Sequence, residues 1–398
     1  MKKLLIIGLV LLILAPALFA DDAKVMPAKV GRFYVAPIYS FVPGTYDDDG
    51  RRYDFPDGPI KLFNLGFAVE YGINDWITAA MQWVPGVTLW SDLEDATGIK
   101  EANMNGLADL FAGVKMQIIG ANAPVQSEKV RFAVAPGVII PLPGVDFEEE
   151  FKNMSEEKAA TVANMDNHVF AAGGRFYFDY VFNNNFFINF HNETIFYLNN
   201  RELNKQSPDL AGFKAKVGEG IPDLAAGLGA TGYTGADLAE SLAALDGEVN
   251  YRSNITFEIE PVFTTSLKDG IVLNAGIPIN YQFSPASKYE MNGSFRNDLN
   301  DAKKHVDNLI AQGAPLEQLA GGLAGIEEGY DNTFSDLDSH TLRIGPNLSV
   351  FFMKLPLPLE FKFQYNVPVW GRNTNAQHGA IFQIRAYFKF KNKDVQEE

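Results

Sequence analysis

The sequence predicts an all-β fold: a transmembrane up-and-down antiparallel β-barrel of twelve strands with helical extracellular loops. In the last predicted strand, 380–390, apolar side chains alternate with polar or charged ones without interruption. Hydrophobic residues make up 47% of the chain, yet beyond the N-terminal run no segment approaches the length of a membrane-spanning helix. The connections between the predicted strands alternate strictly between short and long. Fourteen strands are the alternative, if one long loop contains a further hairpin.

The N-terminus has the pattern of a secretory signal peptide, which we assign to residues 1–20. Lys2 and Lys3 precede an apolar run, and small residues lead to a cleavage site after Ala20. The apolar run is shorter than the ~20 residues that a spanning helix needs, which disfavours an N-terminal anchor. We therefore divide the chain into the signal peptide, a short periplasmic N-terminal segment, the barrel and a polar C-terminal tail. The last three parts span residues 21–31, 32–390 and 391–398.

Composition excludes several classes of protein. The chain has no cysteine, so disulfides and cysteine metal sites are absent. Its formal charge of −16 becomes −18 when Lys2 and Lys3 leave with the signal peptide, which argues against nucleic-acid binding. The acidic loop residues lack the spacing of a dedicated calcium loop, so we predict no metal site and no cofactor. The expected partners are outer-membrane lipid and small solutes.

Twelve runs have the length and alternation of tilted membrane strands. They cover residues 32–42, 61–71, 76–84, 107–119, 129–140, 168–181, 186–198, 253–265, 271–283, 340–353, 359–370 and 380–390. The short connections contain Gly, Asn, Asp or Pro and are predicted to be periplasmic turns; the long connections are then extracellular. An even number of strands places both termini in the periplasm of a Gram-negative bacterium. A soluble β-sandwich is disfavoured, because its strands would not keep an apolar face directed outward.

The predicted last strand also identifies partners. Its terminal Phe390 resembles the C-terminal signature by which bacterial outer-membrane barrels reach their assembly machinery. We expect this strand to pair with strand 32–42, so that no strand edge is left in lipid.

Two long loops show helical rather than strand periodicity. In 284–339, apolar residues recur at helical spacing, with Asn297 or Asp298 as the N-cap, Gly313 at the end and a second short helix from Pro315. In 199–252, we predict a pair of helices at about 222–228 and 236–245. We expect the apolar faces of these helices to pack together as a cap.

The alternation of the strands assigns the charges that point into the barrel. The inward acids are Glu70, Asp109, Asp179, Glu193, Glu258, Glu260 and Glu360, and the inward bases are Lys115, Arg131, Arg175, Arg343, Lys362, Arg385 and Lys389. Seven acids therefore face seven bases. A balanced set in a narrow lumen favours a structural network of ion pairs over an ion filter.

Prolines interrupt several strands, and three of them lie on consecutive strands: Pro261, Pro278 and Pro346. Each proline removes a backbone donor from a ladder that has no water to replace it. Bends or bulges that curve the barrel are the simple explanation. The functional hypothesis is a weakened seam through which an apolar solute leaves the lumen sideways.

Short motifs resemble the FadL-like superfamily of outer-membrane transporters, including the putative outer-membrane proteins of phenol-degradation pathways. They are Gly-Leu-Ala-Asp-Leu-Phe-Ala-Gly-Val-Lys at 106–115 and the turn Tyr-Gly-Ile-Asn-Asp at 71–75. The resemblance implies passive uptake of hydrophobic or amphipathic small molecules. The fatty-acid transporters of that superfamily have an N-terminal hatch, whereas only residues 21–31 precede the first strand here. Any plug of this barrel is therefore expected to come from loops or inward side chains.

Under this transport hypothesis, candidate path residues fall into two groups. The apolar capture surface is formed by Leu224, Leu228, Leu238, Leu242, Leu309 and Ile310, and the lumen path by Asp109, Lys115, Arg175 and Glu258. The alternative is a structural or surface-binding barrel, porin-like or adhesin-like, without a specific transport substrate. An enzyme is disfavoured. The outer-membrane phospholipase has a His-x-Ser arrangement, whereas here His191, the only histidine near the middle of an inward strand face, is followed two residues later by Glu193.

Overall fold

The structure is a computed structural model that describes residues 22–56, 58–83, 90–92, 109–142, 169–199, 201–202, 208–292, 294–333 and 337–389. The predicted signal peptide and C-terminal tail lie outside these residues. The chain forms two compact units. One is built from Asn199–Arg252 and Ala286–Leu337, and the other contains the remaining described residues.

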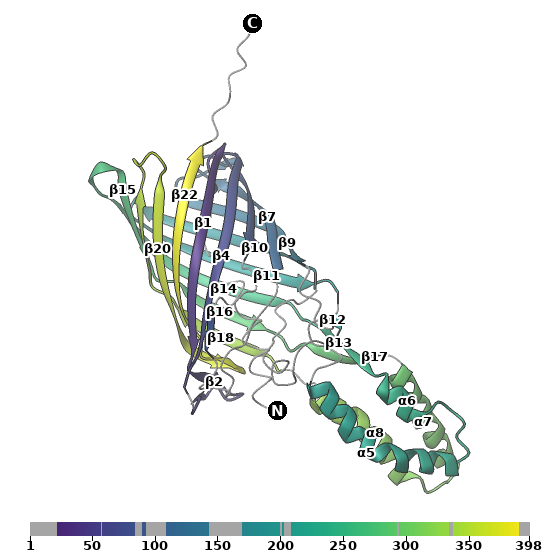
Figure 1. Cartoon of the computed structure of the whole chain (residues 1–398). Helices are drawn as coiled ribbons and strands as arrows, with labels where there is room; N and C mark the ends of the chain where they lie inside the picture. Colours follow the sequence, from purple (N-terminus) through teal and green to yellow (C-terminus); the bar gives the residue numbers. More distant parts are fainter. Residues whose placement is uncertain are drawn as a thin grey trace. The chain divides into compact units, whose positions relative to one another are not determined.

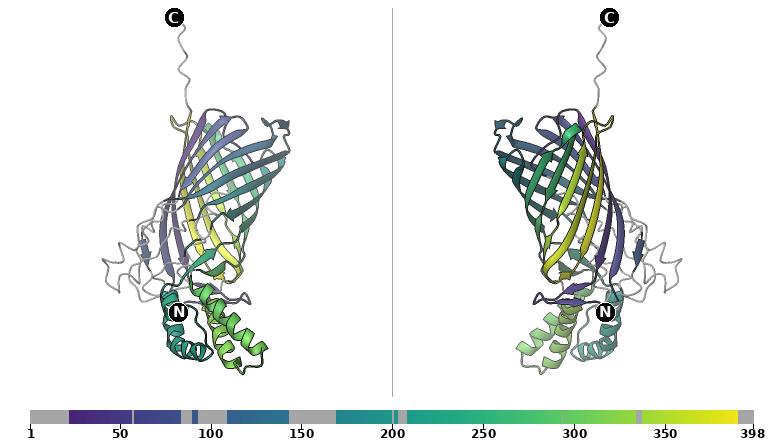
Figure 2. Two further views of the ribbon diagram at one scale, coloured as in Figure 1. Left: turned by 90° about the vertical axis from the view of Figure 1, so that its right-hand side faces the viewer. Right: turned by 90° about the vertical axis from the view of Figure 1, so that its left-hand side faces the viewer.

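The larger unit is a closed antiparallel β-barrel of twelve strands, as predicted (Figures 1 and 2). The ring runs β11-β10-β9-β7-β5-β4-β1-β22-β20. The next two strands are each divided in two: β18 and β19 form one and both pair with β20, and β16 and β15 form the other and both pair with β14. The ring closes where β14 pairs with β11. The strands are β1 (Val30–Val42), β4 (Ile60–Asn74), β5 (Ile77–Trp83), β7 (Asp109–Gly120), β9 (Val130–Pro141), β10 (Ala171–Asn183), β11 (Phe186–Tyr197), β14 (Asn254–Ser266), β15 (Ile271–Gly276), β16 (Ile279–Ser284), β18 (Ser339–Ile344), β19 (Asn347–Phe352), β20 (Leu359–Arg372) and β22 (His378–Lys389).

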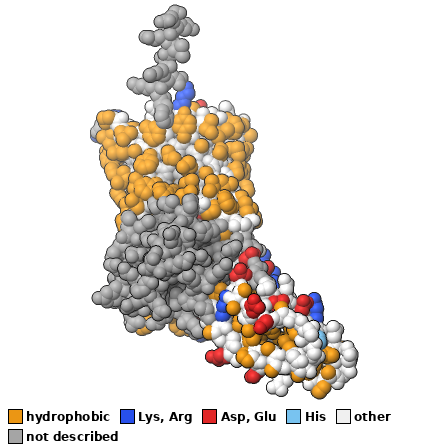
Figure 3. Space-filling view, turned by 45° about the vertical axis from the view of Figure 1, so that its right-hand side comes forward, with side chains coloured by type: hydrophobic (Ala, Val, Ile, Leu, Met, Phe, Trp, Pro, Cys, Tyr) orange, Lys and Arg blue, Asp and Glu red, His pale blue; other side chains and the backbone are white. Residues whose placement is uncertain are grey.

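Alternation along each strand gives the barrel its two faces. In β4, buried and more exposed residues alternate from Ile60 to Asn74. Large apolar side chains such as Phe178, Phe363 and Ile384 are at least 40% exposed on the outer face. Figure 3 shows hydrophobic side chains gathered over the visible barrel wall. An apolar exterior around a polar interior is the pattern of a barrel that lies in lipid.

The first and last strands close the barrel, as predicted from the sequence. β1 pairs with β22 from Val30↔Lys389 to Phe41↔His378. The pairing leaves neither strand with an open edge, which lipid could not satisfy. The short connections, such as the turn between β10 and β11, all lie at one end of the barrel, here called the short-turn end; the other end is the long-loop end.

Two of the predicted strands are each interrupted by a proline. The run 271–283 divides into β15 and β16 at Pro278, and the run 340–353 divides into β18 and β19 at Pro346. Backbone pairing continues across each interruption, because Gly345 N–H donates to the Pro278 carbonyl at 2.9 Å and Tyr365 N–H donates to the Pro346 carbonyl at 3.1 Å. Each proline thus removes one donor without opening the wall.

Short additional strands pair with the barrel or with one another near its two ends. At the long-loop end, β2 (Gly44–Tyr46) pairs with β3 (Arg52–Asp54) and β21 (Thr374–Asn375). β6 (Trp90–Asp92) pairs with β4. At the short-turn end, β8 (Val125–Gln126) pairs with β7, and the 3-10 helix η2 (Lys268–Gly270) forms the turn before β15.

The smaller unit contains four helices and a three-stranded sheet. The elements are α5 (Pro208–Ala230), α6 (Leu238–Ala243), α7 (Ser294–Ala311), α8 (Glu317–Thr333), β12 (Arg201–Glu202), β13 (Asp246–Asn250) and β17 (Lys288–Asn292). The predicted packing of apolar helix faces is observed: one core joins residues of all four helices, including Phe213, Leu242, Phe295 and Tyr330. None of the helices in the described residues is long and apolar enough to cross a membrane.

The helix limits differ from the predicted ones. α5 begins at Pro208, and Pro222 lies inside it rather than near its start. The missed signal is the spacing of Leu210, Phe213, Val217 and Ile221, which places these residues on one helix face in contact with the core. α7 begins at Ser294, before the predicted caps Asn297 and Asp298, because Phe295 on its first turn is fully buried in the same core. Gly313 follows α7 in the left-handed region, at φ +91°, as expected for a helix end.

Candidate functional site

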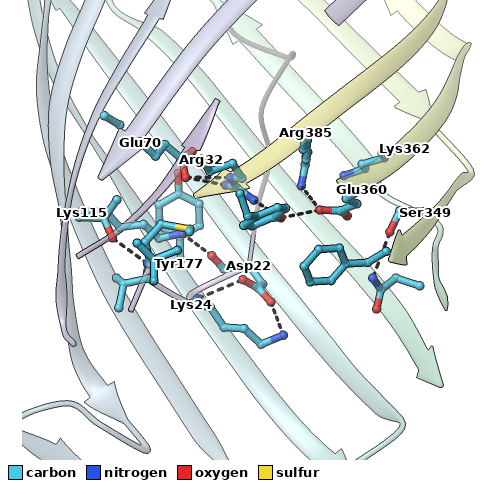
Figure 4. A pocket seen from close by; sticks show the side chains of 18 of the residues that line it. Asp22, Lys24, Arg32, Glu70, Lys115, Tyr177, Ser349, Glu360, Lys362 and Arg385 are labelled. Atoms are coloured by element: carbon cyan, nitrogen blue, oxygen red, sulfur yellow. Dashed lines mark hydrogen bonds and ion pairs between the residues drawn. The ribbon is translucent and has the colours of Figure 1, made fainter. Parts of the chain in front are cut away.

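The barrel encloses a cavity of about 570 Å³ (Figure 4). Its lining residues come from the N-terminal segment and from strands all round the ring. The charged lining residues are Asp22, Lys24, Arg32, Glu70, Lys115, Arg175, Glu260, Glu360, Lys362 and Arg385, and the apolar and aromatic ones include Met26, Phe111, Tyr177, Val262, Phe351, Met353 and Tyr387. A twelve-stranded barrel is wider than one that side chains fill completely and narrower than an open porin, so a partly filled lumen is expected.

The N-terminal segment, 22–29, lies inside the barrel at the short-turn end. Starting beside β4, Ala28 N–H donates to Asp75 Oδ1 at 3.0 Å, and Met26 N–H then donates to Thr78 Oγ1 at 2.8 Å. Ala23 N–H reaches Asp179 Oδ1 on β10 at 3.1 Å. In the strand order, β10 is nearly opposite β1, so the segment crosses the lumen. We call residues 22–29 the strap.

This placement corrects the expectation that only loops or inward side chains would occupy the barrel. A segment without its own secondary structure suffices, because the wall supplies partners for its backbone. Gln117 Nε2 donates to the Ala23 carbonyl at 2.9 Å, and Lys115 Nζ donates to the Asp22 carbonyl. Ala23 is fully buried and packs with Ala133, Ala135 and Tyr177.

Asp22 anchors the described end of the strap electrostatically. Burial alone would raise the pKa of its carboxyl, but Lys24, Arg131 and Lys115 outweigh that effect and lower this pKa to about 2. The carboxylate lies 2.9 Å from Lys24 Nζ and 3.6 Å from Arg131 Nη1. Asp22 is therefore ionised at every physiological pH.

Some of the wall charges form ion pairs, as expected for a structural network. Arg32 Nη2 lies 2.6 Å from Glu70 Oε2, Arg131 Nε 3.0 Å from Asp179 Oδ2, and Arg385 Nη1 3.4 Å from Glu360 Oε2. A fourth pair joins Arg175 on β10 to Glu193 on β11, which are register partners. Arg32 did not enter the predicted set, although its place in the alternation of β1 directs it inward.

A second, much smaller cavity of about 10 Å³ lies next to the interrupted strands. Its lining residues are Glu258, Pro278, Asn280, Arg343, Gly345, Gln364 and Asn366. This volume holds about one water molecule. Arg343 is 6% exposed and donates from Nη1 to Gln282 Oε1 at 3.4 Å.

The structure does not bring the four predicted lumen residues together at one cavity. Lys115 and Arg175 line the large cavity, and Glu258 lines the small one. Asp109, the first residue of β7, lines neither of these cavities.

The predicted capture surface is the core of the helical unit instead. Leu228, Leu238 and Leu242 are at most 5% exposed, and Leu224 and Ile310 pack against them. Leu309, on α7, is partly buried. The helical spacing that singled these residues out reflects packing between helices, so an exposed apolar surface is not formed by them.

At the long-loop end, one group of carboxylates in the described residues is close enough to share a cation. The group is Asp47, Asp48 and Asp49, whose ligand atoms lie within 4.8 Å of one another. Asp47 Oδ1 already accepts hydrogen bonds from the backbone N–H groups of Asp49 and Arg51, at 3.0 and 2.7 Å. These bonds are those of a turn that aspartate stabilises, and they explain why the three carboxylates lie close together.

Comparison with known proteins identifies the fold. No protein-family model matches the sequence, and no curated protein matches it either. Among solved structures, the COG4313 outer membrane channel from Pseudomonas putida F1 is similar, with a TM-score of 0.54 and 9% identity over 93% of this chain and 99% of that chain. At this identity the likeness shows the fold alone.

Two further structures match more weakly. A FadL homologue from Pseudomonas aeruginosa has a TM-score of 0.34 and 11% identity, over 94% of this chain and 96% of that one. The TodX monoaromatic hydrocarbon channel, as a deletion mutant, has a TM-score of 0.34 and 8% identity, over 92% and 91%. Neither score is high enough to bear on function. The chain has the fold of an outer-membrane channel, and the resemblance noted in the sequence is confirmed at that level.

Proposed function

We propose that this outer-membrane barrel is a channel for the passive uptake of small hydrophobic or amphipathic solutes. The observation that carries the proposal is the 570 Å³ cavity inside a closed barrel with an apolar exterior. That volume is in the range of pockets that hold small organic molecules. The lining combines apolar side chains such as Val262 and Phe351 with charged ones, which suits solutes that have both kinds of surface.

The proposed path runs through the barrel from the long-loop end, which we place outside the cell, to the short-turn end in the periplasm. Glu258 lies at the small cavity, and Lys115 and Arg175 lie at the large one beside the strap. Both termini are then periplasmic. Because the strap crosses the lumen, a solute that leaves along the axis must displace it or pass beside it.

Purified protein in planar bilayers tests this function directly. We expect discrete conductance steps, and a change in those steps when long-chain fatty acids or small aromatic compounds are added. The measurement uses refolded wild-type protein whose shift between unheated and heated samples in gel electrophoresis shows a folded barrel. A folded barrel that neither conducts nor responds to any of these solutes would refute the proposal in favour of a structural or surface-binding barrel.

A sideways exit near Pro261, Pro278 and Pro346 is the second part of the proposal. Its support is the interruption of two adjacent strands at prolines, beside a cavity large enough for one water. Replacing Pro278 and Pro346 together with Ala restores two backbone donors to the ladder. We expect this variant to take up apolar solutes more slowly while its ion conductance is unchanged.

Radiolabelled solute uptake and single-channel recording of the same variant provide the two measurements. Pro37→Ala is the matched control, since Pro37 lies on β1, away from the interrupted strands. Uptake that stays at the wild-type rate in the double variant would remove the seam from the proposal.

A further inference from the structure

We infer that the lumen prefers anions, that Lys362 and Arg343 set this preference, and that the solutes it takes are small organic anions with an apolar part. The inference rests on the proposed channel function and names its substrate class. The formal net charge of the whole chain, −16, would by itself suggest a preference for cations. The lumen differs from the rest of the chain, because its net charge is positive. Six cationic and four carboxylate side chains line the described part of the large cavity, a surplus of two positive charges.

Most of these charges neutralise one another. Arg32 pairs with Glu70 and Arg385 pairs with Glu360, while Lys24 pairs with Asp22 inside the strap. Arg175 pairs with Glu193, just behind the cavity lining. Two further lining residues, Glu260 and Lys115, have opposite charges: Glu260 accepts a hydrogen bond from Asn347 Nδ2 at 2.6 Å, and Lys115 donates to the Asp22 carbonyl. A charge that is paired or already hydrogen-bonded has less attraction left for a solute, so selectivity depends on the positive charge that remains.

Lys362 is one that remains. Its side chain faces the cavity, and within the described residues it makes no hydrogen bond or ion pair (Figure 4). Its cross-strand partner on β19 is the neutral Ser349. Glu360, two residues away on the same face, attracts Lys362 only at longer range, because it forms its ion pair with Arg385 and accepts a hydrogen bond from the Tyr387 hydroxyl at 2.6 Å. The ammonium group is therefore available to a ligand.

Arg343 is the second cationic side chain without an ion pair in the described residues. It is buried, yet the described residues offer its guanidinium no ion pair, and its Nη2 has no hydrogen-bond partner. The carboxylate in the same small cavity, Glu258, accepts a hydrogen bond from Asn280 Nδ2 at 3.1 Å. The small cavity holds about one water molecule, so Arg343 contributes positive charge beside the path rather than a binding site for a whole organic anion.

One strand connects the two cations. Successive inward residues of β20 are Lys362, Gln364 and Asn366, spaced by about 7 Å as alternate residues of a strand are. Gln364 and Asn366 line the small cavity with Arg343, and Lys362 lines the large one. The polar side chains of β20 thus connect the lining of the large cavity with the positive charge of Arg343.

The apolar part of the ligand follows from the neighbours of Lys362. Phe351 is two residues from Ser349 on the same strand and contacts Tyr387, with tilted rings whose centroids are 4.7 Å apart. Met26 and Met353 line the same cavity. An ammonium beside aromatic and thioether side chains fits a carboxylate attached to a ring or a short chain better than a fully hydrated inorganic anion.

Reversal potentials in a KCl gradient test the preference without knowledge of the natural solute. We expect the wild-type channel to favour chloride, Lys362→Gln to lose most of that preference, and Lys362→Glu to favour potassium. Lys268→Gln removes the same charge from the turn before β15 and should behave like the wild type. Recording at about 0.1 M salt keeps the Debye length near 10 Å, so that the fixed charges are felt.

Competition with benzoate tests the ligand class. Benzoate should reduce the chloride current of the wild type several-fold more effectively than that of Lys362→Gln or Arg343→Gln. Benzyl alcohol, which has the ring without the charge, and benzylamine, which has the opposite charge, should have little effect on any of them.

The outcomes separate the two proposals. A folded barrel that does not conduct refutes the channel function itself. A barrel that conducts but favours potassium, or whose reversal potential is the same in wild type and Lys362→Glu, refutes the anion preference alone. Equal inhibition by benzoate and benzyl alcohol refutes the assignment of an anionic ligand.

Discussion

Single-channel conductance should rise several-fold when residues 23–27 are deleted, because the shortened strap can no longer cross the lumen. The deletion removes the backbone groups that bind Thr78, Gln117 and Asp179, while Asp22 and the contacts of Ala28 are retained in the sequence. Planar-bilayer recording of the deletion variant and the wild type measures the effect. Retaining Asp22 also leaves the predicted cleavage site after Ala20 unchanged.

Thr78→Val is the matched control for the strap deletion. It removes one acceptor, the hydroxyl that binds Met26 N–H, and keeps the side-chain shape. We expect a small increase in brief high-conductance openings rather than a permanently larger channel. If the deletion variant folds and conducts as the wild type does, the strap does not restrict the lumen.

Acid should weaken the strap through Asp22. The pKa of this carboxyl is lowered to about 2 from an ordinary value of 3.8, so the ionised form is the one that holds the strap. That stabilisation is complete above pH 4 and is lost as the pH falls toward 2. Physiological pH changes leave Asp22 ionised, and a pH-controlled release through this group is confined to strong acid.

The second large effect is on stability. Replacing Glu193 with Gln should lower the free energy of unfolding by about 3 kcal/mol, because the buried guanidinium of Arg175 is left without its carboxylate. Arg175 also lies over the Phe111 ring, 4.6 Å from its centroid, which holds it in place after the partner is lost. Denaturant unfolding in detergent micelles, followed by tryptophan fluorescence, gives the difference.

Two controls accompany this prediction. The double variant Arg175→Met and Glu193→Leu removes both charges and should recover most of the loss, since a buried pair can be replaced by apolar side chains at little cost. Arg52→Met breaks the exposed pair between Arg52 and Asp54 and should cost less than about 1 kcal/mol. Equal costs for Glu193→Gln and Arg52→Met would show that the lumen solvates Arg175 as well as bulk water does.

The strands could be predicted because the pattern that defines them lies in consecutive residues. Alternation with a period of two assigns each residue of β4 or β22 to the inside or the outside, and the turns between strands have their own residue chemistry. All twelve predicted runs are strands in the structure, two of them interrupted at the prolines that the sequence had marked. The direction of each inward charge followed from the same alternation.

The helical unit was predictable in part. Apolar spacing indicated helices in both long loops, and their apolar faces do form one core. The start of α5 was missed, because Gly212, Gly218 and Gly220 weaken the helix propensity before Pro222, which itself lies inside the helix. Contact with α8 and α6 in the folded unit compensates for this weak helix propensity.

By itself, then, the sequence determined the barrel, its twelve strands, its closing pair and the sign of each wall charge, because alternation is a property of consecutive residues. Only the tertiary structure decided which charges meet. Seven acids and seven bases appear balanced along the chain, but ion pairing depends on distances between strands, and in the described residues neither Lys362 nor Arg343 forms an ion pair. The strap likewise has no pattern of its own. Its place in the lumen follows from donors and acceptors that strands distant in the sequence bring together.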